Sequence, residues 1–184
     1  MPDSLPSFSL TDQHRRAHSF PGGRPALLCF VKEDCPTCGM TMPLIEAASR
    51  ALRDEIDVVA IGQDAAGNAL LIERHRLTAP MLDDSDLKIS YGYNVEIVPT
   101  IILADARGAE LRRFEGFDKS DWQSVLSQAA HLAGGPGPRI DPQIDWSAYP
   151  KSRPGCGSKS VEPGVAERLA AEASGSRLRA RQIE

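Results

Sequence analysis

The feature that most constrains this chain is a pair of cysteines, Cys35 and Cys38, between two segments of different character. An uninterrupted apolar run, Ala26–Val31, precedes the pair and predicts a buried strand. Residues 39–52 follow with helical spacing, so both thiols are expected in the first helical turn, where a disulfide can close between them. The unpaired N–H groups and dipole of a helix N-terminus favour a thiolate at Cys35. A thiolate is the nucleophile of thiol–disulfide exchange.

Length and composition allow one ordinary core. At roughly 100–200 residues per domain, the 184 residues predict one domain, residues 1–133, and an extension, residues 134–184. Hydrophobic residues make up 41% and charged residues 25%, as in soluble globular proteins. The net charge of −4 gives no electrostatic reason to expect a nucleic acid or a membrane as partner.

Short apolar runs alternate with segments of helical period, which predicts an α/β fold with a central mixed sheet flanked by helices. The N-terminal residues 13–23 are expected to form a turn and loop because of their polar residues, glycines and proline. The expected strands are 8–10, 26–31, 56–61, 81–82, 101–103 and 109–114, and the expected helices are 39–52, 68–76, 86–91 and 120–132.

The composition changes at residues 134–138, Gly-Gly-Pro-Gly-Pro, which predicts a linker. Residues 139–154 show no steady period and are expected to be anchored by scattered apolar side chains. A short helix is expected over residues 162–173, and residues 174–184 are expected to fray. The expected anchors are Ile140, Ile144, Trp146 and Tyr149.

Four features, in order along the chain, resemble the thioredoxin superfamily in its TlpA/ResA-like or peroxiredoxin-like branch. They are the Cys-Pro-Thr-Cys sequence after a hydrophobic strand, a proline five residues past the second cysteine, a Val-Pro-Thr sequence and a glycine near the end of the last strand. The resemblance covers residues 5–133. The matching positions are Cys35–Cys38, Pro43, Val98 to Thr100 and Gly116.

The resemblance implies a thioredoxin-like fold and a role for each matching residue. Cys35 would be the attacking thiolate, and Cys38 would resolve the mixed disulfide. Pro99 would be cis, and Val98 would pair with a bound substrate strand. Pro36 and Thr37, between the two cysteines, are assigned with Val98 and Pro99 to substrate binding. No cofactor is implied.

Two positions depart from the thioredoxin pattern. An aromatic residue usually precedes the first cysteine, whereas residues 32–34 are Lys-Glu-Asp, and two carboxylates should oppose thiolate formation there. Many thioredoxins also have a buried aspartate six residues before the first cysteine, where this chain has Cys29. Cys29 is expected to be a small buried hydrophobe. Proton transfer during resolution should therefore differ or use water.

The two remaining questions about cysteine concern metal and Cys156. Structural zinc normally takes four ligands, but no second Cys-x-x-Cys exists and the four histidines show no ligand spacing, so no metal is expected. Cys156 lies between two glycines, with Arg153 and Lys159 nearby. A flexible backbone and these cations would expose its thiol and lower its pKa. It is either a third redox thiol on a mobile arm, able to bond to Cys35, or an incidental surface cysteine.

The sequence therefore predicts an enzyme, a thioredoxin-like oxidoreductase that exchanges disulfides through Cys35 and Cys38. Two alternatives remain: a peroxiredoxin-like thiol peroxidase and a non-enzymatic redox-sensing interaction module. One feature argues against the peroxidase. Peroxiredoxins place Thr or Ser three residues before the peroxidatic cysteine, where this chain has Lys32. The expected partners are a disulfide-containing protein or small thiol and an unidentified electron donor. The N-terminus lacks the pattern of a signal peptide, so a cytoplasmic location is expected.

Overall fold

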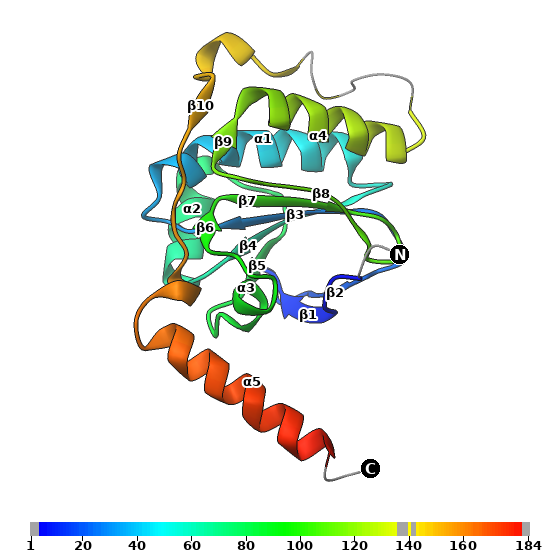
Figure 1. Cartoon of the computed structure of the whole chain (residues 1–184). Helices are drawn as coiled ribbons and strands as arrows, with labels where there is room; N and C mark the ends of the chain where they lie inside the picture. Colours follow the sequence, from blue (N-terminus) through cyan, green and yellow to red (C-terminus); the bar gives the residue numbers. More distant parts are fainter. Residues whose placement is uncertain (1–3, 136–139, 141–142, 182–184) are drawn as a thin grey trace.

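The computed structural model describes residues 4–135, 140 and 143–181, which contain a central five-stranded sheet (Figure 1). The strands follow the order β5-β4-β3-β7-β8. β3 to β5 are parallel, whereas β7 pairs antiparallel with both β3 and β8. This mixed sheet confirms the predicted α/β architecture. The strands are β3 (Ala26–Val31), β4 (Asp57–Gly62), β5 (Met81–Asp83), β7 (Thr100–Ala104) and β8 (Glu110–Glu115).

The central strand β3 carries the site. All six of its residues are buried, as expected for an apolar run between two other strands and covered on both faces. Its register places Cys29 opposite Ala60 of β4 and Ile101 of β7. The strand ends at Val31, four residues before Cys35, so the centre of the sheet fixes the turn that bears the two cysteines.

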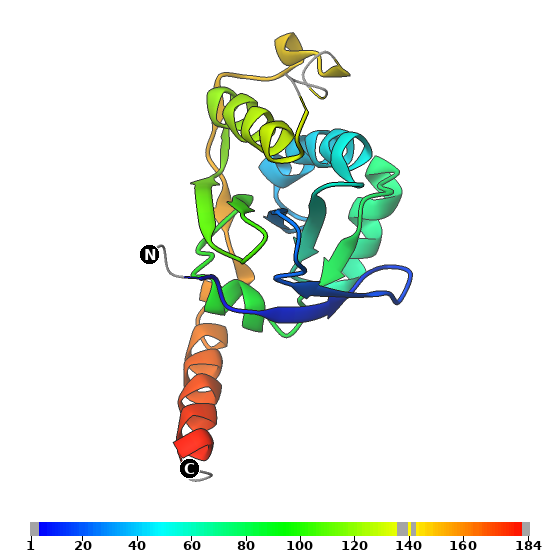
Figure 2. The same cartoon turned by 90° about the vertical axis from the view of Figure 1, so that its right-hand side faces the viewer.

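Helices and a hairpin cover the two faces of the sheet. In Figure 1, α1 and α4 lie on one face, and α3 lies on the other together with the β1–β2 hairpin; Figure 2 shows the same layers end-on. α2 contacts α1, β4 and β5. The helices are α1 (Pro36–Leu52), α2 (Ala65–His75), α3 (Lys88–Gly92) and α4 (Lys119–Leu132), and the hairpin strands are β1 (Phe8–Thr11) and β2 (Ala17–Phe20).

Local sequence signals explain where the helices begin. Cys35 is the N-cap of α1 and Pro36 is its first residue, a position where the missing N–H of proline costs nothing. The helix continues through Pro43 and buries its apolar stripe against the sheet. α2 begins three residues before its predicted start because the Asp64 carboxylate accepts a hydrogen bond from the Gly67 N–H at 2.7 Å.

Two predictions of local structure are wrong. Residues 13–23 contain β2 and are not wholly loop, because residues 17–20 pair with β1 and bury Phe20. The last helix, α5 (Val165–Arg181), continues through residues 174–181, which were expected to fray. Its alanines and arginines favour a helix even where the side chains are exposed.

The extension crosses the edge of the domain before it reaches α5. Figure 1 shows it passing α4 and running beside β9 and β6 to α5, which projects away from the sheet. β10 (Ser152–Arg153) pairs with β9 (Phe117–Asp118), and β11 (Cys156–Gly157) pairs with β6 (Ile97–Val98). The predicted linker lies partly outside the described residues. The four predicted anchors all pack against the core.

α5 makes its main contact near its start, where Leu169 is buried, whereas Leu178 is 65% exposed. The 3-10 turns η2 (Trp146–Ala148) and η3 (Lys159–Val161) shape the path of the extension. Within the described residues, none of the helices combines the length and apolar character that crossing a bilayer requires.

Candidate active site

Cys35 lies at the N-terminus of α1 and is almost fully enclosed. Its residue is 1% exposed, and its sulfur accepts a hydrogen bond from the Cys38 N–H at 3.3 Å. The same sulfur lies 3.5 Å from the carbonyl oxygen of Val98. Val98 is the first residue of the segment 98–100, which we call the proline loop. The strand-to-helix turn therefore brings Cys35 against a segment more than 60 residues away in the sequence.

Cys38 lies one turn further into α1 and is 0% exposed. The Lys32 N–H donates to its sulfur at 3.4 Å. Burial raises the pKa of the Cys38 thiol, and the neighbouring Cys35 sulfur raises it further. A thiol with a raised pKa stays protonated, and it becomes a nucleophile only when it loses its proton.

Hydrogen bonds make Cys35 the stronger acid of the pair. The Cys38 thiol contributes most to lowering the pKa of Cys35 to about 5, although burial acts in the opposite direction. The Cys156 thiol and the N–H groups of Cys38 and Thr37 add to this effect. Each of these groups donates to the charged form of sulfur, which lowers the pKa of a thiol. These donors therefore favour the thiolate form of Cys35.

The two carboxylates directly before Cys35, those of Glu33 and Asp34, each form an ion pair with a lysine. Glu33 accepts a hydrogen bond from the Lys159 ammonium at 2.9 Å, and Lys32 lies 3.3 Å from Asp34. The sequence indicated that the two carboxylates would oppose thiolate formation. The pKa of Cys35 nevertheless falls, because each carboxylate has its own cation and the thiolate has direct donors.

The proline loop forms the opposite wall. The Val98–Pro99 peptide bond is cis, and both residues are buried. The Gly116 N–H donates to the Pro99 carbonyl oxygen at 2.8 Å, and the Thr100 hydroxyl donates to the Ile97 carbonyl oxygen at 2.6 Å. These bonds fix the backbone of β6 beside Cys35.

Cys156 is not the exposed surface thiol that the sequence predicted. It is half-buried, and it pairs with Val98 across the β11–β6 bridge. Its pKa is raised, first by the hydrogen bond with the Cys35 sulfur and then by burial, whereas the sequence predicted a lowered pKa. The prediction failed because the Cys35 sulfur acts on Cys156 from the neighbouring segment and because the Lys159 ammonium bonds to Glu33. The structure does bring Cys156 to Cys35.

Pro36 and Thr37 directly follow Cys35, whereas Cys29 lies in the central sheet. Pro36 is exposed, whereas Thr37 is buried and its hydroxyl donates to the Pro154 carbonyl oxygen of the extension at 2.7 Å. Cys29 is 0% exposed in β3, and burial raises the pKa of its thiol. Of the four cysteines, only Cys29 lies in a strand of the central sheet.

A cluster of polar side chains that sequence reasoning missed holds the extension beyond Cys156. The Gln63 amide donates to the hydroxyls of Ser158 (2.7 Å) and Ser90 (3.0 Å), and its oxygen accepts from the Lys159 N–H at 2.9 Å. The Ser90 hydroxyl donates to Asp84 at 2.7 Å. The signal that could have found these residues is the glutamine directly after an apolar strand, a buried polar position that needs partners.

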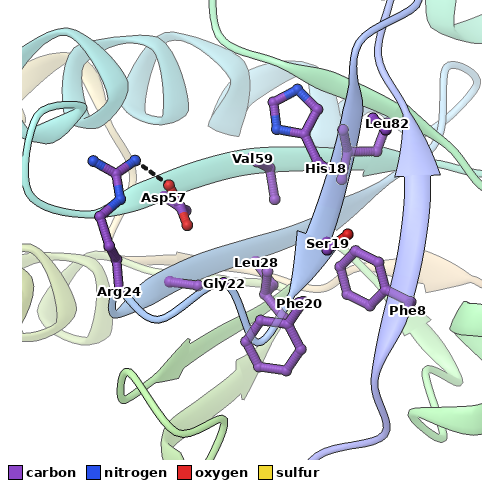
Figure 3. Close-up of a pocket in the computed structure, with 12 residues that line it drawn as sticks. Phe8, His18, Ser19, Phe20, Gly22, Arg24, Leu28, Asp57, Val59 and Leu82 are labelled. Carbon is purple, nitrogen blue, oxygen red and sulfur yellow. Dashed lines mark hydrogen bonds and ion pairs between the residues drawn. The ribbon is translucent and has the colours of Figure 1, made fainter.

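Away from the cysteines, a pocket of about 400 Å³ lies between the β1–β2 hairpin and the sheet (Figure 3). It is lined by Phe8, Phe20 and Leu28 and is closed at one end by the ion pair of Arg24 with Asp57. Its lining contains no cysteine, so it is separate from the redox centre. Among the described residues, no group of three or more His, Cys, Asp or Glu side chains is arranged to hold a metal ion.

The fold and the site together define a thioredoxin-fold protein with an enclosed dithiol and a third thiol beside it. Residues 1–110 match the AhpC/TSA family, and the chain belongs to that family. The thiol-disulfide oxidoreductase YkuV of Bacillus subtilis strain 168 is 27% identical over 101 residues, which cover 51% of this chain and 68% of that protein.

Solved structures show the same fold. The thioredoxin domain of the thiol-disulfide oxidoreductase BVU-2223 from Bacteroides vulgatus superposes with a TM-score of 0.60 at 18% identity, covering 69% of this chain and 95% of that chain. The peroxidoxin BcpB from Mycobacterium tuberculosis superposes with a TM-score of 0.58 at 17% identity, covering 72% and 95%. The thioredoxin-like fold that the sequence features implied is confirmed.

Proposed function

We propose that this chain is a thiol–disulfide oxidoreductase in which Cys35 attacks and Cys38 resolves. The observation that carries the assignment is the opposite tuning of the two thiols. The pKa of Cys35 falls to about 5, whereas burial raises that of Cys38. The relationship to YkuV supports the same reaction.

The reaction proceeds in two exchanges. The Cys35 thiolate attacks one sulfur of a substrate disulfide, which forms a mixed disulfide and releases the other substrate sulfur as a thiolate that takes up a proton. Cys38 then loses its proton and attacks the Cys35 sulfur. The substrate leaves as a thiol, and the enzyme keeps the Cys35–Cys38 disulfide. Two electrons pass from enzyme to substrate, and an external thiol donor restores the dithiol.

Reduction of insulin disulfides tests the assignment. The wild-type protein, supplied with dithiothreitol, should accelerate insulin reduction, and Cys35→Ser should abolish the acceleration. Cys29→Ala is the matched control, because that thiol is buried in β3 and has no role in the exchange. Full activity in Cys35→Ser would contradict the proposal. A Cys38→Ser trap of mixed disulfides, with and without Cys156, would then identify the protein or small thiol substrate.

A thiol peroxidase is the second candidate, favoured by the low pKa of Cys35 and by the two thiols that hydrogen-bond to it. The thiolate would reduce a peroxide, becoming a sulfenic acid that Cys38 or Cys156 would capture as a disulfide with loss of water. Rapid consumption of hydrogen peroxide in stopped-flow measurements would support this candidate. A rate no higher than that of free cysteine would exclude it.

Residues Val98, Pro99, Pro36 and Thr37 are proposed to bind substrate. Val98 contacts the Cys35 sulfur and is joined to Pro99 by a cis bond, and Pro36 and Thr37 lie between the two cysteines. The cytoplasmic location stays a prediction from the sequence, which cell fractionation would test.

A further inference from the structure

The arm, residues 152–160, lies directly over the attacking sulfur. Its first part pairs with β9, and Cys156 pairs with Val98 of β6. Between these two bridges, the Pro154 carbonyl oxygen accepts the hydrogen bond from Thr37 within the Cys-Pro-Thr-Cys turn. The arm therefore contacts both walls of the site, the start of α1 and the proline loop.

The fit between the arm and the proline loop is close. A methyl group added at Gly155 would come within 2.4 Å of the Val98 carbonyl oxygen, a distance that real contacts essentially never show. At Gly157, two residues further along, an added methyl group would meet nothing within 4 Å. Glycine at residue 155 is thus required for the arm to lie against β6, whereas glycine at residue 157 is not.

Polar contacts hold the arm after Cys156. Ser158 and Ser160 are each 1% exposed, and the Ser160 hydroxyl donates to the Val95 carbonyl oxygen at 3.0 Å. The Ser158 N–H donates to the Glu96 carbonyl oxygen at 2.8 Å, and Lys159 bonds to Glu33. Buried and satisfied polar groups of this kind fix one position of a segment.

As a result, the site is filled by a cysteine of the same chain. Cys156 pairs with Val98, whose carbonyl oxygen lies 3.5 Å from the Cys35 sulfur, and Cys35 is 1% exposed. Any external disulfide that approaches Cys35 along the proline loop needs the volume that the arm occupies.

We propose that the arm is a tethered substrate strand, in which Cys156 exchanges with the Cys35–Cys38 disulfide and external disulfides reach Cys35 only after the arm has left. The inference rests on the proposed function, since it needs that disulfide to form. The Cys156 thiolate attacks the Cys35 sulfur, the Cys35–Cys156 bond forms, and the Cys35–Cys38 bond breaks. Cys38 leaves as a thiolate and takes up the proton that Cys156 lost. The oxidation level does not change.

The test uses the full-length chain with Cys38→Ser, which leaves Cys35 and Cys156 as the two thiols at the site. Oxidised glutathione first caps Cys35, and Cys156 then displaces glutathione to close the Cys35–Cys156 disulfide. Acid quenching, alkylation and peptide mass spectrometry measure the rate of closure. Because the arm positions the thiol, Gly155→Ala in this background should slow closure about tenfold or more. Gly157→Ala should close at the unaltered rate.

A second measurement addresses access. In the reduced protein, iodoacetamide should alkylate Cys35 about tenfold faster in Gly155→Ala than in Gly157→Ala, because a displaced arm exposes the thiol. Equal rates in the two glycine variants, or Cys35 that stays capped by glutathione, would overturn the tethered substrate. Insulin reduction that depends on Cys35 would leave the proposed function standing in either case. Loss of that dependence would instead remove the proposed function.

Discussion

Cys35 has two thiol neighbours, and each stabilises its charge. Cys38 approaches from within α1 and Cys156 from the arm, and both donate to the Cys35 sulfur. A hydrogen bond to a charged group contributes more than a neutral one, so each neighbour should have a measurable effect on the acidity of Cys35. The leading contribution comes from Cys38.

Titration of thiolate absorbance at 240 nm tests this ranking. The reduced wild-type protein should lose one thiolate as the pH falls through about 5. Cys156→Ala should raise the pKa of Cys35 by on the order of one unit, since a hydrogen bond to a charged group is lost. Cys38→Ala should raise it further. A larger effect of Cys156→Ala than of Cys38→Ala would contradict the assignment.

The same shift affects the stability of the reduced protein. The pKa of Cys35 in the folded chain lies below that of an unfolded thiol, so the thiolate stabilises the fold above the unfolded pKa. This contribution is lost as the pH falls towards 5. The oxidised protein has no such thiolate, and its free energy of unfolding should therefore depend less on pH between 8 and 5. Chemical denaturation of both forms at several pH values measures the difference.

At the scale of elements, the sequence predicts the sheet better than it predicts the arm. β3 has the predicted bounds, because the polar residues on either side of an apolar run mark where a buried strand begins and ends. α2 begins at a cap that the apolar pattern does not reveal. The arm has no such pattern: its position depends on two short bridges to β9 and β6, and on a glycine that must meet Val98. Local hydrophobic periodicity does not predict contacts of this kind between distant segments.

The residues of the candidate site form the same two groups: some are predicted by local sequence patterns, and others are positioned by contacts between distant segments. Cys35, Cys38 and the proline loop are recognisable because their spacing is local or family-like. The sequence leaves open whether Cys156 reaches Cys35. The direction predicted for its pKa is wrong because the Cys35 sulfur, brought near in the tertiary structure, outweighs the cations nearby in sequence. The nearness of Lys159 to Cys156 in the sequence predicts an interaction between them, but the Lys159 ammonium bonds to Glu33.

The ion pair of Lys159 with Glu33 joins the arm to the segment before Cys35. Both side chains are about one-fifth exposed, so the pair is partly shielded from water. Lys159→Ala should loosen the arm by about 1 kcal/mol and speed alkylation of Cys35 severalfold. Lys151→Ala is the control, since that exposed residue bonds to Lys119 through its backbone carbonyl. Equal alkylation rates in the two variants would show that the ion pair does not hold the arm.

At the scale of the whole molecule, Asp84 affects the free energy of unfolding. Through Ser90 it belongs to the polar cluster around Gln63 that holds the arm. It is 0% exposed and accepts hydrogen bonds from the Ser90 hydroxyl and from the N–H groups of Ser90 and Ile89. Burial raises its pKa to about 6, despite these donors. The folded pKa lies above that of an unfolded carboxyl, so protonation favours the fold. This contribution is greatest below the unfolded pKa and is lost as the pH rises through about 6.

Asp84→Asn should remove that pH dependence. Between pH 8 and pH 5, the wild-type protein should gain on the order of 1 kcal/mol from this carboxyl relative to the variant. The comparison of the two proteins cancels the contributions of other titrating groups. Urea denaturation at pH 5, 6.5 and 8 gives the three differences in free energy of unfolding. A difference that stays constant across this range would show that Asp84 does not titrate there.

The burial of Cys35 under the arm has a consequence for chemical damage. A thiolate is the form of cysteine that peroxides oxidise, first to sulfenic acid and then irreversibly to sulfinic and sulfonic acids. The acidity of Cys35 makes it susceptible, but the arm keeps it 1% exposed and places another thiol beside it. A sulfenic acid formed there would meet Cys38 or Cys156 before a second peroxide could reach it. We therefore expect the arm to protect the Cys35 sulfur from over-oxidation in the interval between substrates.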